Sequence, residues 1–347
     1  MVYILVLNWN NWEASRDCLD ALLKLDYPDC RLVVLDNGSS DGPEEKFREW
    51  AMGAGAGFVS YTRQEAMAGG RPEEEDAKNK KTSGKRPPLV FIQNGENLGY
   101  PGGNNVGLRY ALARGDFEYA WLLNNDTLPE AGALQALVSC ARQAGAAMAG
   151  SKLLYAHETE TLQMAGGGMI WPAAGNAFIV ASGQKDDGQW DKPFPLDYIC
   201  GASLLVRKEV LCRVGFLDER YFLYWEDADW GVRARRAGFR LVYCPSSRVL
   251  HKEGATISKE TGSKETGGKE GNKEAVSGIS GKADYYWVRN GLYFTKKYYP
   301  WFLPLVPLAY LAKHTIVRLL KRQPCNLKYF LLGFLDFISG RIGRRNF

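Results

Sequence analysis

The sequence lacks the patterns that mark several common classes of protein. Its seven cysteines include no Cys-x-x-Cys pair, so they indicate no metal site, and we expect them to be reduced core residues in a cytosolic compartment. No basic segment precedes the first apolar run, and no signal peptide is expected. No GxGxxG motif follows that run, which disfavours a dinucleotide-binding dehydrogenase.

The composition is that of an ordinary globular protein. Hydrophobic residues make up 46% of the 347 positions and charged residues 24%, which excludes a disordered chain, a collagen-like repeat and a disulfide-stapled miniprotein. The length predicts two domains, or one large domain with additions. The net charge of +5 is uneven, because residues 285–347 hold eleven Lys and Arg but one acid, Asp336. The remaining body is mildly acidic and has no basic stripe, so no nucleic-acid partner is expected.

Apolar runs alternate with helical patterns through most of the chain. This order of strand, helix and strand predicts an α/β domain built on a parallel sheet. Strands are expected at 2–7, 31–35, 89–93, 119–123, 202–206 and 240–244, and helices at 14–23, 105–113, 134–144 and 227–237.

Two segments interrupt this pattern. Residues 64–88 contain no aromatic side chain and are rich in Glu, Lys, Gly and Pro, and residues 252–282 repeat a Lys-Glu-Thr/Gly-Gly theme. Neither segment holds enough apolar surface to offset the chain entropy that is lost on ordering. We therefore expect two flexible loops inserted into one domain that spans residues 1–284.

The C-terminal segment, residues 285–347, is basic and aromatic. Its uncharged run at 298–312 contains three prolines and, at 15 residues, is shorter than the ~20 residues that a membrane-spanning helix needs. Apolar faces flanked by Lys and Arg favour helices that lie on a membrane surface. Amphipathic helices that pack on the preceding domain would show the same pattern, so both interpretations stay open.

Polar clusters follow three of the expected strands. They are 36–41 (Asp-Asn-Gly-Ser-Ser-Asp), 97–104 (Asn-Leu-Gly-Tyr-Pro-Gly-Gly-Asn) and 124–126 (Asn-Asn-Asp). In an open parallel sheet, ligands bind outside the carboxyl ends of the strands, which predicts that these clusters line one crevice. Any one of them alone is better explained as an ordinary turn.

A fourth cluster combines acids with aromatic residues. Glu226, Asp227 and Asp229 lie within four positions, among the five aromatic residues of 221–230. Low-dielectric surroundings and neighbouring like charges raise the pKa of a carboxyl group, which is how a general base is made. Acids that merely favour a helix N-terminus would explain the aromatic residues poorly.

Five motifs, taken in order, make the chain resemble family-2 glycosyltransferases of the GT-A fold, and most of all their rhamnosyltransferase-like branch. They are VLNWN at 6–10, LDNGSSD at 35–41, NLGYPGGNN at 97–105, LNND at 123–126 and WEDADW at 225–230. The match runs from residue 2 to about 254, outside the two expected loops. It implies a GT-A (Rossmann-like) α/β fold, with a mixed, mostly parallel sheet flanked by helices and a C-terminal amphipathic helical extension.

The resemblance also implies roles for particular residues. Those expected to bind the nucleotide-sugar are Asn8, Asp36, Asn37, Gly102, Gly103, Asn104, Asn124 and Asn125. Asp126 would bind a divalent cation, Mg²⁺ or Mn²⁺, although the family's Asp-x-Asp motif begins with an Asn here. His251 would lie near the diphosphate or the metal. Asp227 would be the catalytic base, with Glu226 as the rival candidate.

These residues imply an inverting sugar transfer. A cation would neutralise the departing diphosphate, and a carboxylate would take the proton of the acceptor hydroxyl. The expected partners are a nucleotide-diphosphate sugar, for which the resemblance implies rhamnose, and a glycan or lipid-linked acceptor for cell-wall polysaccharide synthesis at the inner face of the cell membrane.

Two alternatives remain at this stage. A sugar-nucleotide-binding protein without catalysis would not need the Glu226–Asp227 pair. A nucleotidyltransferase of similar sheet topology would be expected to carry Gly and Lys after the first strand, and residues 8–12 contain neither.

Overall fold

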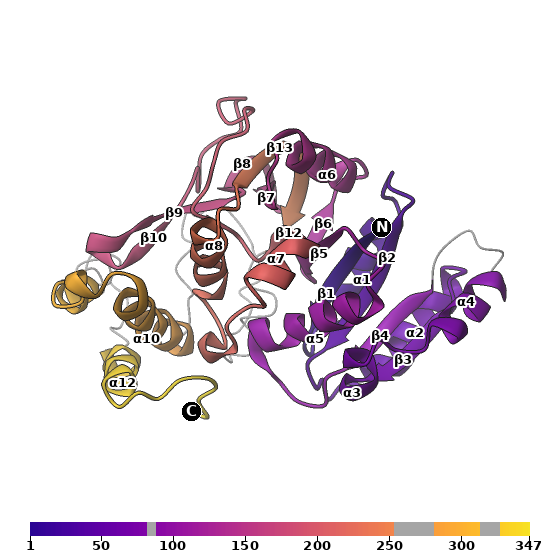
Figure 1. Cartoon of the computed structure of the whole chain (residues 1–347), viewed down its shortest axis with the longest axis horizontal. Helices are drawn as coiled ribbons and strands as arrows, with labels where there is room; N and C mark the ends of the chain where they lie inside the picture. The colour runs from indigo at the N-terminus through magenta and orange to yellow at the C-terminus, as the bar shows by residue number, and fades with distance from the viewer. Residues whose placement is uncertain (82–87, 253–280, 313–326) are drawn as a thin grey trace.

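The computed structural model describes residues 1–81, 88–252, 281–312 and 327–347. Ten strands form its main sheet, namely β1 (Val2–Asn8), β2 (Cys30–Asp36), β3 (Phe58–Thr62), β4 (Leu89–Gln93), β5 (Tyr119–Asn124), β6 (Thr127–Pro129), β7 (Met148–Tyr155), β8 (Glu158–Ala165), β12 (Ser203–Arg207) and β13 (Leu241–His251). Their order across the sheet is β3-β4-β2-β1-β5-β12-β7-β13-β6, and β8 pairs with β7 (Figure 1).

The main sheet is mixed and mostly parallel, as predicted. Strands β1, β2, β3, β4 and β5 run parallel, and β13 runs parallel to β7. Strand β12 is antiparallel to both β5 and β7. All six predicted strands form, at or within a residue or two of their expected starts, while β3, β6, β7 and β8 were not predicted.

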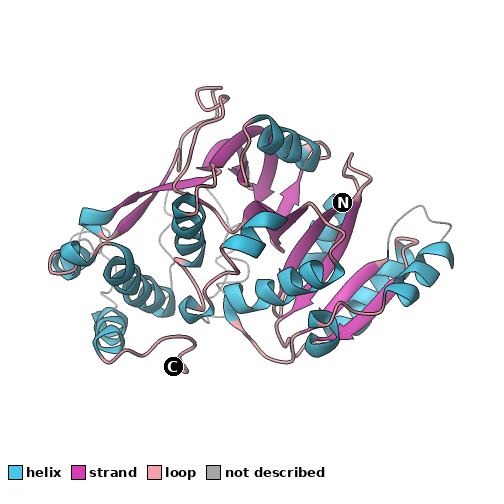
Figure 2. Cartoon of the chain, in the orientation of Figure 1, coloured by secondary structure: helices cyan, strands magenta, loops and turns pink. Residues whose placement is uncertain are grey.

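Helices pack against both faces of the sheet (Figure 2), because successive side chains of a buried strand point to opposite sides. The helices are α1 (Trp12–Leu22), α2 (Pro43–Gly53), α3 (Arg63–Met67), α4 (Pro72–Lys81), α5 (Gly99–Arg114), α6 (Ala133–Gln143), α7 (Lys208–Arg213), α8 (Glu226–Arg236), α10 (Gly281–Tyr298) and α12 (Leu327–Ile338). On β1, Tyr3 and Leu5 share a buried cluster with α5, whereas Ile4 and Val6 share one with α1.

Helices α3 and α4 occupy residues for which a flexible loop was predicted. The prediction is wrong there, because a buried acid anchors α4 where apolar side chains are missing. Glu75 is 1% exposed and accepts hydrogen bonds from Arg31 Nη1 at 2.6 Å and from the hydroxyls of Tyr61 and Tyr110, both at 2.7 Å. Most of the second predicted loop, residues 253–280, lies outside the described residues.

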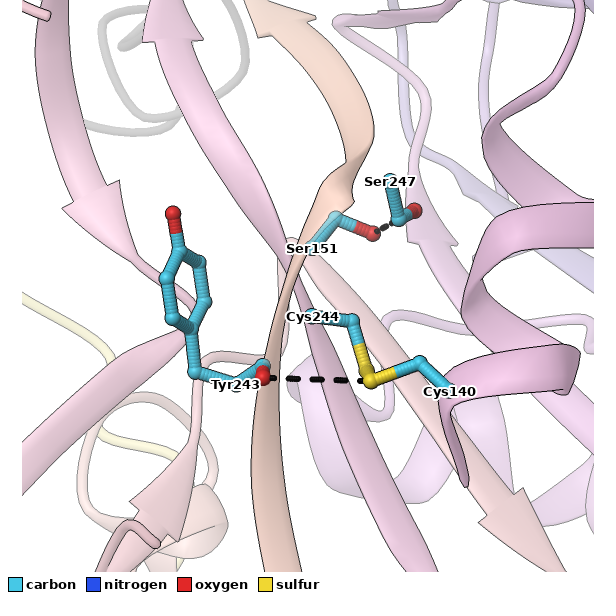
Figure 3. Close-up of a disulfide and its surroundings, with 5 residues drawn as sticks. All are labelled: Cys140, Ser151, Tyr243, Cys244 and Ser247. Carbon is cyan, nitrogen blue, oxygen red and sulfur yellow. Dashed lines mark hydrogen bonds between the residues drawn. A yellow bond between two sulfur atoms is a disulfide. The ribbon is translucent and has the colours of Figure 1, made fainter. Parts of the chain in front are cut away.

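A disulfide joins Cys140 of α6 to Cys244 of β13 (Figure 3). This corrects the prediction that both cysteines are reduced. The packing of α6 on β13 brings the two Cα atoms to 6.0 Å, within the usual range for a disulfide, across a sequence separation of 104. So long a separation carries no signal in the sequence. Cys18, Cys30 and Cys212 are free.

The C-terminal segment packs on the domain through α10 and remains partly exposed beyond it. Tyr285, Val288 and Phe294 of α10 are buried, and α12 packs along α10. The boundary predicted at residue 284 falls inside α10. In the described parts of the chain, no helix combines the length and the apolar character that crossing a bilayer would require.

Candidate functional site

The carboxyl ends of the parallel strands bring the predicted polar clusters to one edge of the sheet. The pairing register sets Asn8 opposite Asp36, and Asp36 opposite Gln93. Leu7, just before the end of β1, lies opposite Asn124 at the end of β5. The first residues after these strands therefore emerge side by side, as the sequence predicted.

A relay of hydrogen bonds connects three of the predicted donor-site residues. Asn125 Nδ2 donates to Ser15 Oγ, Ser15 Oγ donates to Asn8 Oδ1, and Asn8 Nδ2 donates to Asp36 Oδ1, each at 2.8 Å. Ser15 was not predicted. Its signal was a hydroxyl on the apolar face of α1, where it is fully buried beneath the strand ends.

Asp36 is fully buried and organises the loop that follows β2. Its Oδ1 accepts from Ser39 Oγ at 2.6 Å and its Oδ2 from Ser39 N at 2.9 Å. Gln93 Nε2 donates to the same Oδ2 at 3.0 Å. Ser39 and Gln93 thus belong to this site together with Asn8 and Asp36.

The glycine-rich start of α5 packs directly against this edge. Asn37 Nδ2 donates to Gly99 O at 3.0 Å, and Asn37 Oδ1 accepts from Asn94 Nδ2 at 2.8 Å. A Cβ atom added to Gly103 would lie 2.5 Å from the Leu7 side chain and 2.7 Å from Asn37 Oδ1. Only glycine therefore permits this close approach.

Gly102 and Asn104 belong to the same first turn of α5. A Cβ on Gly102 would lie 2.8 Å from the Leu98 side chain, and Asn104 Nδ2 donates to Tyr100 O at 3.0 Å. Both residues therefore contribute to the packing and shape of the turn.

The turn between β5 and β6 carries the Asn-Asn-Asp motif. Asn125 is buried and bonded to α1, whereas Asn124 is half-buried at the end of β5. Asp126 is 4% exposed, and its Oδ1 lies 3.0 Å from Nε2 of His251. The antiparallel pairing of β13 with β6 places His251 there, opposite Thr127.

Gln163 of β8 orients the His251 ring. Its Oε1 lies 2.7 Å from His251 Nδ1, so Nδ1 carries the hydrogen and Nε2 faces the carboxylate of Asp126. Burial raises the pKa of Asp126, but the charge of His251 and its hydrogen bond outweigh burial and hold this pKa below its usual value. Sequence reasoning missed Gln163, since nothing in its strand pattern marks it.

The Asp126–His251 pair suits a divalent cation. An imidazole nitrogen and a carboxylate oxygen are both metal ligands, so a metal ion could take the place of the proton that a charged His251 shares with Asp126. Within the described residues, no set of three His, Cys, Asp or Glu could hold a metal.

Glu226 and Asp227 begin α8. Asp227 is half-buried, with Oδ1 accepting from Ala228 N at 2.8 Å and Oδ2 from Gly201 N at 3.3 Å. Burial raises the pKa of Asp227 to about 6, although these backbone N–H groups pull it down. Glu226 is 6% exposed, and burial followed by the charge of Asp227 raises its pKa well above the usual value. Its Oε2 has no hydrogen-bond partner in the described residues.

Asp229, the third acid of this cluster, has a structural role. It is fully buried and accepts from Arg233 Nε at 2.7 Å, Lys297 Nζ at 2.5 Å and the Tyr298 hydroxyl at 2.7 Å. The bonds to Lys297 and Tyr298 link α8 to α10. Asp229 is therefore held in a structural network, unlike the Glu226–Asp227 pair that precedes it.

Residues 200–202 connect the acidic pair to the edge of the sheet. Asn124 N donates to Ala202 O at 3.1 Å, next to Gly201, whose N–H donates to Asp227. The Tyr100 hydroxyl, from the first turn of α5, donates to Gly201 O at 2.6 Å. The Asn-Asn-Asp turn, the glycine-rich turn and Asp227 therefore all adjoin this one short segment.

The loop before Glu226 has an unusual backbone that α10 supports. Phe222, Tyr224 and Trp225 adopt left-handed φ angles of 63°, 66° and 76°, which non-glycine residues rarely do. Asn290 of α10, 2% exposed, donates from Nδ2 to Tyr221 O and Leu223 O at 2.8 Å and to Tyr224 O at 3.1 Å. Sequence reasoning missed Asn290, because it lies in the segment predicted to act at a membrane.

Comparison with known proteins agrees with this arrangement. A model of the family described as "Glycosyltransferase like family 2" matches residues 1–265. The chain is 42% identical over 69 residues to N-acetylglucosaminyl-diphospho-decaprenol L-rhamnosyltransferase of Mycobacterium tuberculosis, a match covering 20% of this chain and 22% of that protein. It is 24% identical over 170 residues to the low-salt glycan biosynthesis hexosyltransferase of Haloferax volcanii, covering 48% of this chain and 52% of that protein.

These relatives are matched over about half of their length or less. Among solved structures, that of GalNAc-T7 with UDP, GalNAc and Mn²⁺ aligns with 98% of this chain and 58% of its own, at a TM-score of 0.51 and 12% identity. That likeness shows a shared fold. The family model covers most of the chain and both halves of the site, so the chain belongs to glycosyltransferase-like family 2.

Proposed function

We propose that the protein is an inverting glycosyltransferase that moves a sugar from a nucleotide-diphosphate donor to a hydroxyl group, with Asp227 as general base. The observation that carries this proposal is the acidic pair at the start of α8. Asp227 is held by Gly201 beside the end of β5, and burial raises its pKa to about 6. A carboxylate poised near neutrality is a stronger base than an ordinary one and is still ionised at pH 7.

The reaction is a single displacement. The acceptor hydroxyl gives its proton to a carboxylate oxygen of Asp227 while its oxygen attacks the anomeric carbon. The bond from that carbon to the diphosphate breaks, and its electron pair leaves with the nucleoside diphosphate. Attack from the side opposite the leaving group inverts the anomeric configuration. General-base assistance of this kind is worth roughly 10²–10⁴-fold in rate.

Asp126 and His251 would hold a divalent cation, Mg²⁺ or Mn²⁺. When bound, the cation supplies a positive charge that neutralises the diphosphate as it departs. In this proposal Asn8 and Asp36 shape the nucleotide pocket together with Asn37 and Asn125, and the half-buried Asn124 approaches the donor.

The substrates follow from the relatives. One relative is named as a transferase of L-rhamnose to a diphospho-decaprenol-linked sugar. We extend this to an activated hexose such as rhamnose as donor and to a lipid-linked glycan as acceptor, in the synthesis of cell-wall polysaccharide. Such an acceptor would place the protein at the inner face of the cell membrane, held there by its C-terminal segment.

The test compares Asp227→Asn with Asp187→Asn, which changes an exposed acid in the same way. A panel of nucleotide-sugars with Mn²⁺ is first screened for protection against thermal unfolding, and turnover is then followed by release of the nucleoside diphosphate. We expect Asp227→Asn to lose about 10²-fold or more in kcat with donor protection intact, and Asp187→Asn to match the wild type. Near-normal turnover by a folded Asp227→Asn protein would contradict the assignment.

A further inference from the structure

A hairpin outside the main sheet exposes an apolar face. The sequence from 161 to 184 contains no charged residue, and it forms β9 (Gly167–Trp171), the short helix η1 (Pro172–Ala174) and β10 (Asn176–Ile179). An antiparallel hairpin on a domain surface normally alternates apolar and polar side chains. This one has apolar residues on both faces.

One face of the hairpin is packed and the other is open. Ile170 and Ala177, which are opposite each other in the register, pack against the buried cluster that contains Trp225. Met169 and Phe178 are the next opposed pair and are 43% and 45% exposed. Trp171 is 53% exposed and stacks on Phe178 with ring centroids 5.1 Å apart.

The C-terminal segment meets this hairpin at its tip. The Tyr310 hydroxyl donates to Gly175 O, and Val306 packs so closely on Gly175 that a Cβ there would clash. Helix η3 (Pro300–Phe302) contacts η1. The hairpin and the residues 300–312 thus lie together at one end of the molecule (Figure 1).

The exposed apolar residues of these two segments form what we name the hairpin–tail surface. Its members are Met169, Trp171, Phe178, Trp301, Leu305, Leu308 and Leu311. Trp301 is 73% and Leu308 is 66% exposed. Soluble proteins seldom leave large apolar side chains gathered in this way unless a partner covers them.

The charges of the C-terminal segment indicate which partner. In the described part of 285–347, the exposed charged side chains, Lys296, Lys328, Arg341 and Arg344, are all positive. The one acid, Asp336, is buried and paired with Arg345. Apolar and tryptophan side chains that adjoin a segment whose exposed charges are positive complement an anionic lipid surface.

We propose that the hairpin–tail surface docks on an anionic lipid bilayer, and that the hairpin contacts lipid as well as the C-terminal segment. This rests on the proposed function and adds to it a place for the acceptor. Strand β9 pairs with β11 (Tyr198–Ile199), and Gly201, two residues beyond β11, donates to Asp227. The bilayer would thus lie on the acceptor side of the site, so a lipid-linked acceptor would keep its chain in the membrane while its hydroxyl reaches the base.

The test is co-sedimentation of the full chain with vesicles of phosphatidylcholine alone or mixed with phosphatidylglycerol. Trp171→Glu and Leu308→Glu probe the two halves of the surface. Met52→Glu is the control, because Met52 is 70% exposed on α2 at the other end of the molecule. We expect the wild type to prefer the mixed vesicles, each probe variant to bind them about tenfold or more weakly, and the control to bind like the wild type.

Several outcomes overturn the proposal. One is failure of the wild type to bind the mixed vesicles, and another is a Trp171→Glu protein that binds them as tightly as the wild type does. A wild-type dimer that dissociates in the Trp171→Glu variant would show instead that the surface is an interface between two copies of the chain. Unchanged thermal midpoints and nucleotide protection show that the variants are folded. Asp227→Asn should bind vesicles normally, so failure of the proposed chemistry and failure of this docking are separable.

Discussion

At the scale of single residues, the proposed role of Asp227 as general base predicts that activity depends on pH in a definite direction. Asp227 must be ionised to accept a proton, and burial raises its pKa to about 6. The logarithm of kcat/KM should therefore rise with pH through an acid limb near pH 6 and then level off. A pH–rate profile measured with saturating metal checks this. An acid limb near pH 4, the range of an ordinary exposed aspartate, would contradict it.

The same raised pKa means that the ionised Asp227 side chain lowers the free energy of unfolding. The carboxyl group ionises near pH 4 in the unfolded chain but near pH 6 in the folded protein, so the folded state holds the proton more tightly. Its stabilising contribution is complete below about pH 4 and is lost as the pH rises towards 6. Asp227→Asn should therefore raise the free energy of unfolding at pH 8, by about 1–3 kcal/mol.

Urea denaturation at pH 4 and pH 8 measures this effect. The difference between variant and wild type should be larger at pH 8. An equal difference at both pH values would show that Asp227 titrates normally. A variant that is inactive yet more stable would also separate loss of chemistry from loss of folding.

At the scale of elements, α10 is part of the machinery that presents the base. Asn290 satisfies three carbonyls of a loop that contains three left-handed residues. Each buried carbonyl left without a donor costs about 1–3 kcal/mol. We expect Asn290→Ala to let this loop relax, and to lower kcat by tenfold or more while nucleotide protection stays close to that of the wild type.

Steady-state kinetics and nucleotide protection together check the Asn290→Ala prediction. Lys296→Ala is the control, because Lys296 is exposed on the same helix. A fall in stability without a fall in kcat would reduce Asn290 to an ordinary packing residue.

Helix α4 depends on one buried charge. Glu75 forms an ion pair with Arg31 and accepts hydrogen bonds from the hydroxyls of Tyr61 and Tyr110. Removing one partner of a buried pair leaves the other charge uncompensated, so Glu75→Ala should destabilise the protein by about 3–5 kcal/mol. Glu74→Ala, which breaks a pair at the surface, should cost less than about 1 kcal/mol. Thermal or urea unfolding distinguishes the two, and equal effects would contradict the anchoring role.

Elements were predictable from sequence where apolar periodicity is strong. Strand β1 and the apolar face of α1 follow directly from their patterns, as does the convergence of Asp36 and Asn124 at the strand ends. Strand β7 was missed because small residues and Lys152 interrupt its apolar run, although Lys152 is buried against Asp186 at 2.7 Å. Polar residues whose partners are distant in the sequence were missed for a different reason. Gln163 and Asn290 acquire their meaning only once distant segments pack together.

At the scale of the whole molecule, the disulfide links α6 to β13 across 104 residues. Cross-linking a loop of that length restricts the unfolded chain and typically stabilises a protein by about 2–4 kcal/mol. Cys140→Ser should therefore lower the thermal midpoint by several degrees, as should reduction of the wild type. Cys212→Ser, which changes an exposed free cysteine, is the control. A midpoint insensitive to both reductant and Cys140→Ser would show that the bridge does not contribute.

The bonds from α10 to the loop before Glu226 bear on how the protein should be handled. To obtain crystals, one would be inclined to delete the apolar C-terminal segment and keep only the residues that the family model matches. Such a shortened polypeptide would retain Asp126, Asp227 and His251, yet it would lose the amide that braces the peptide groups just upstream of its base. We expect this shortened protein to bind nucleotide normally but to show little turnover. Lack of activity in such a protein would then reflect the loss of Asn290 rather than a wrong choice of donor.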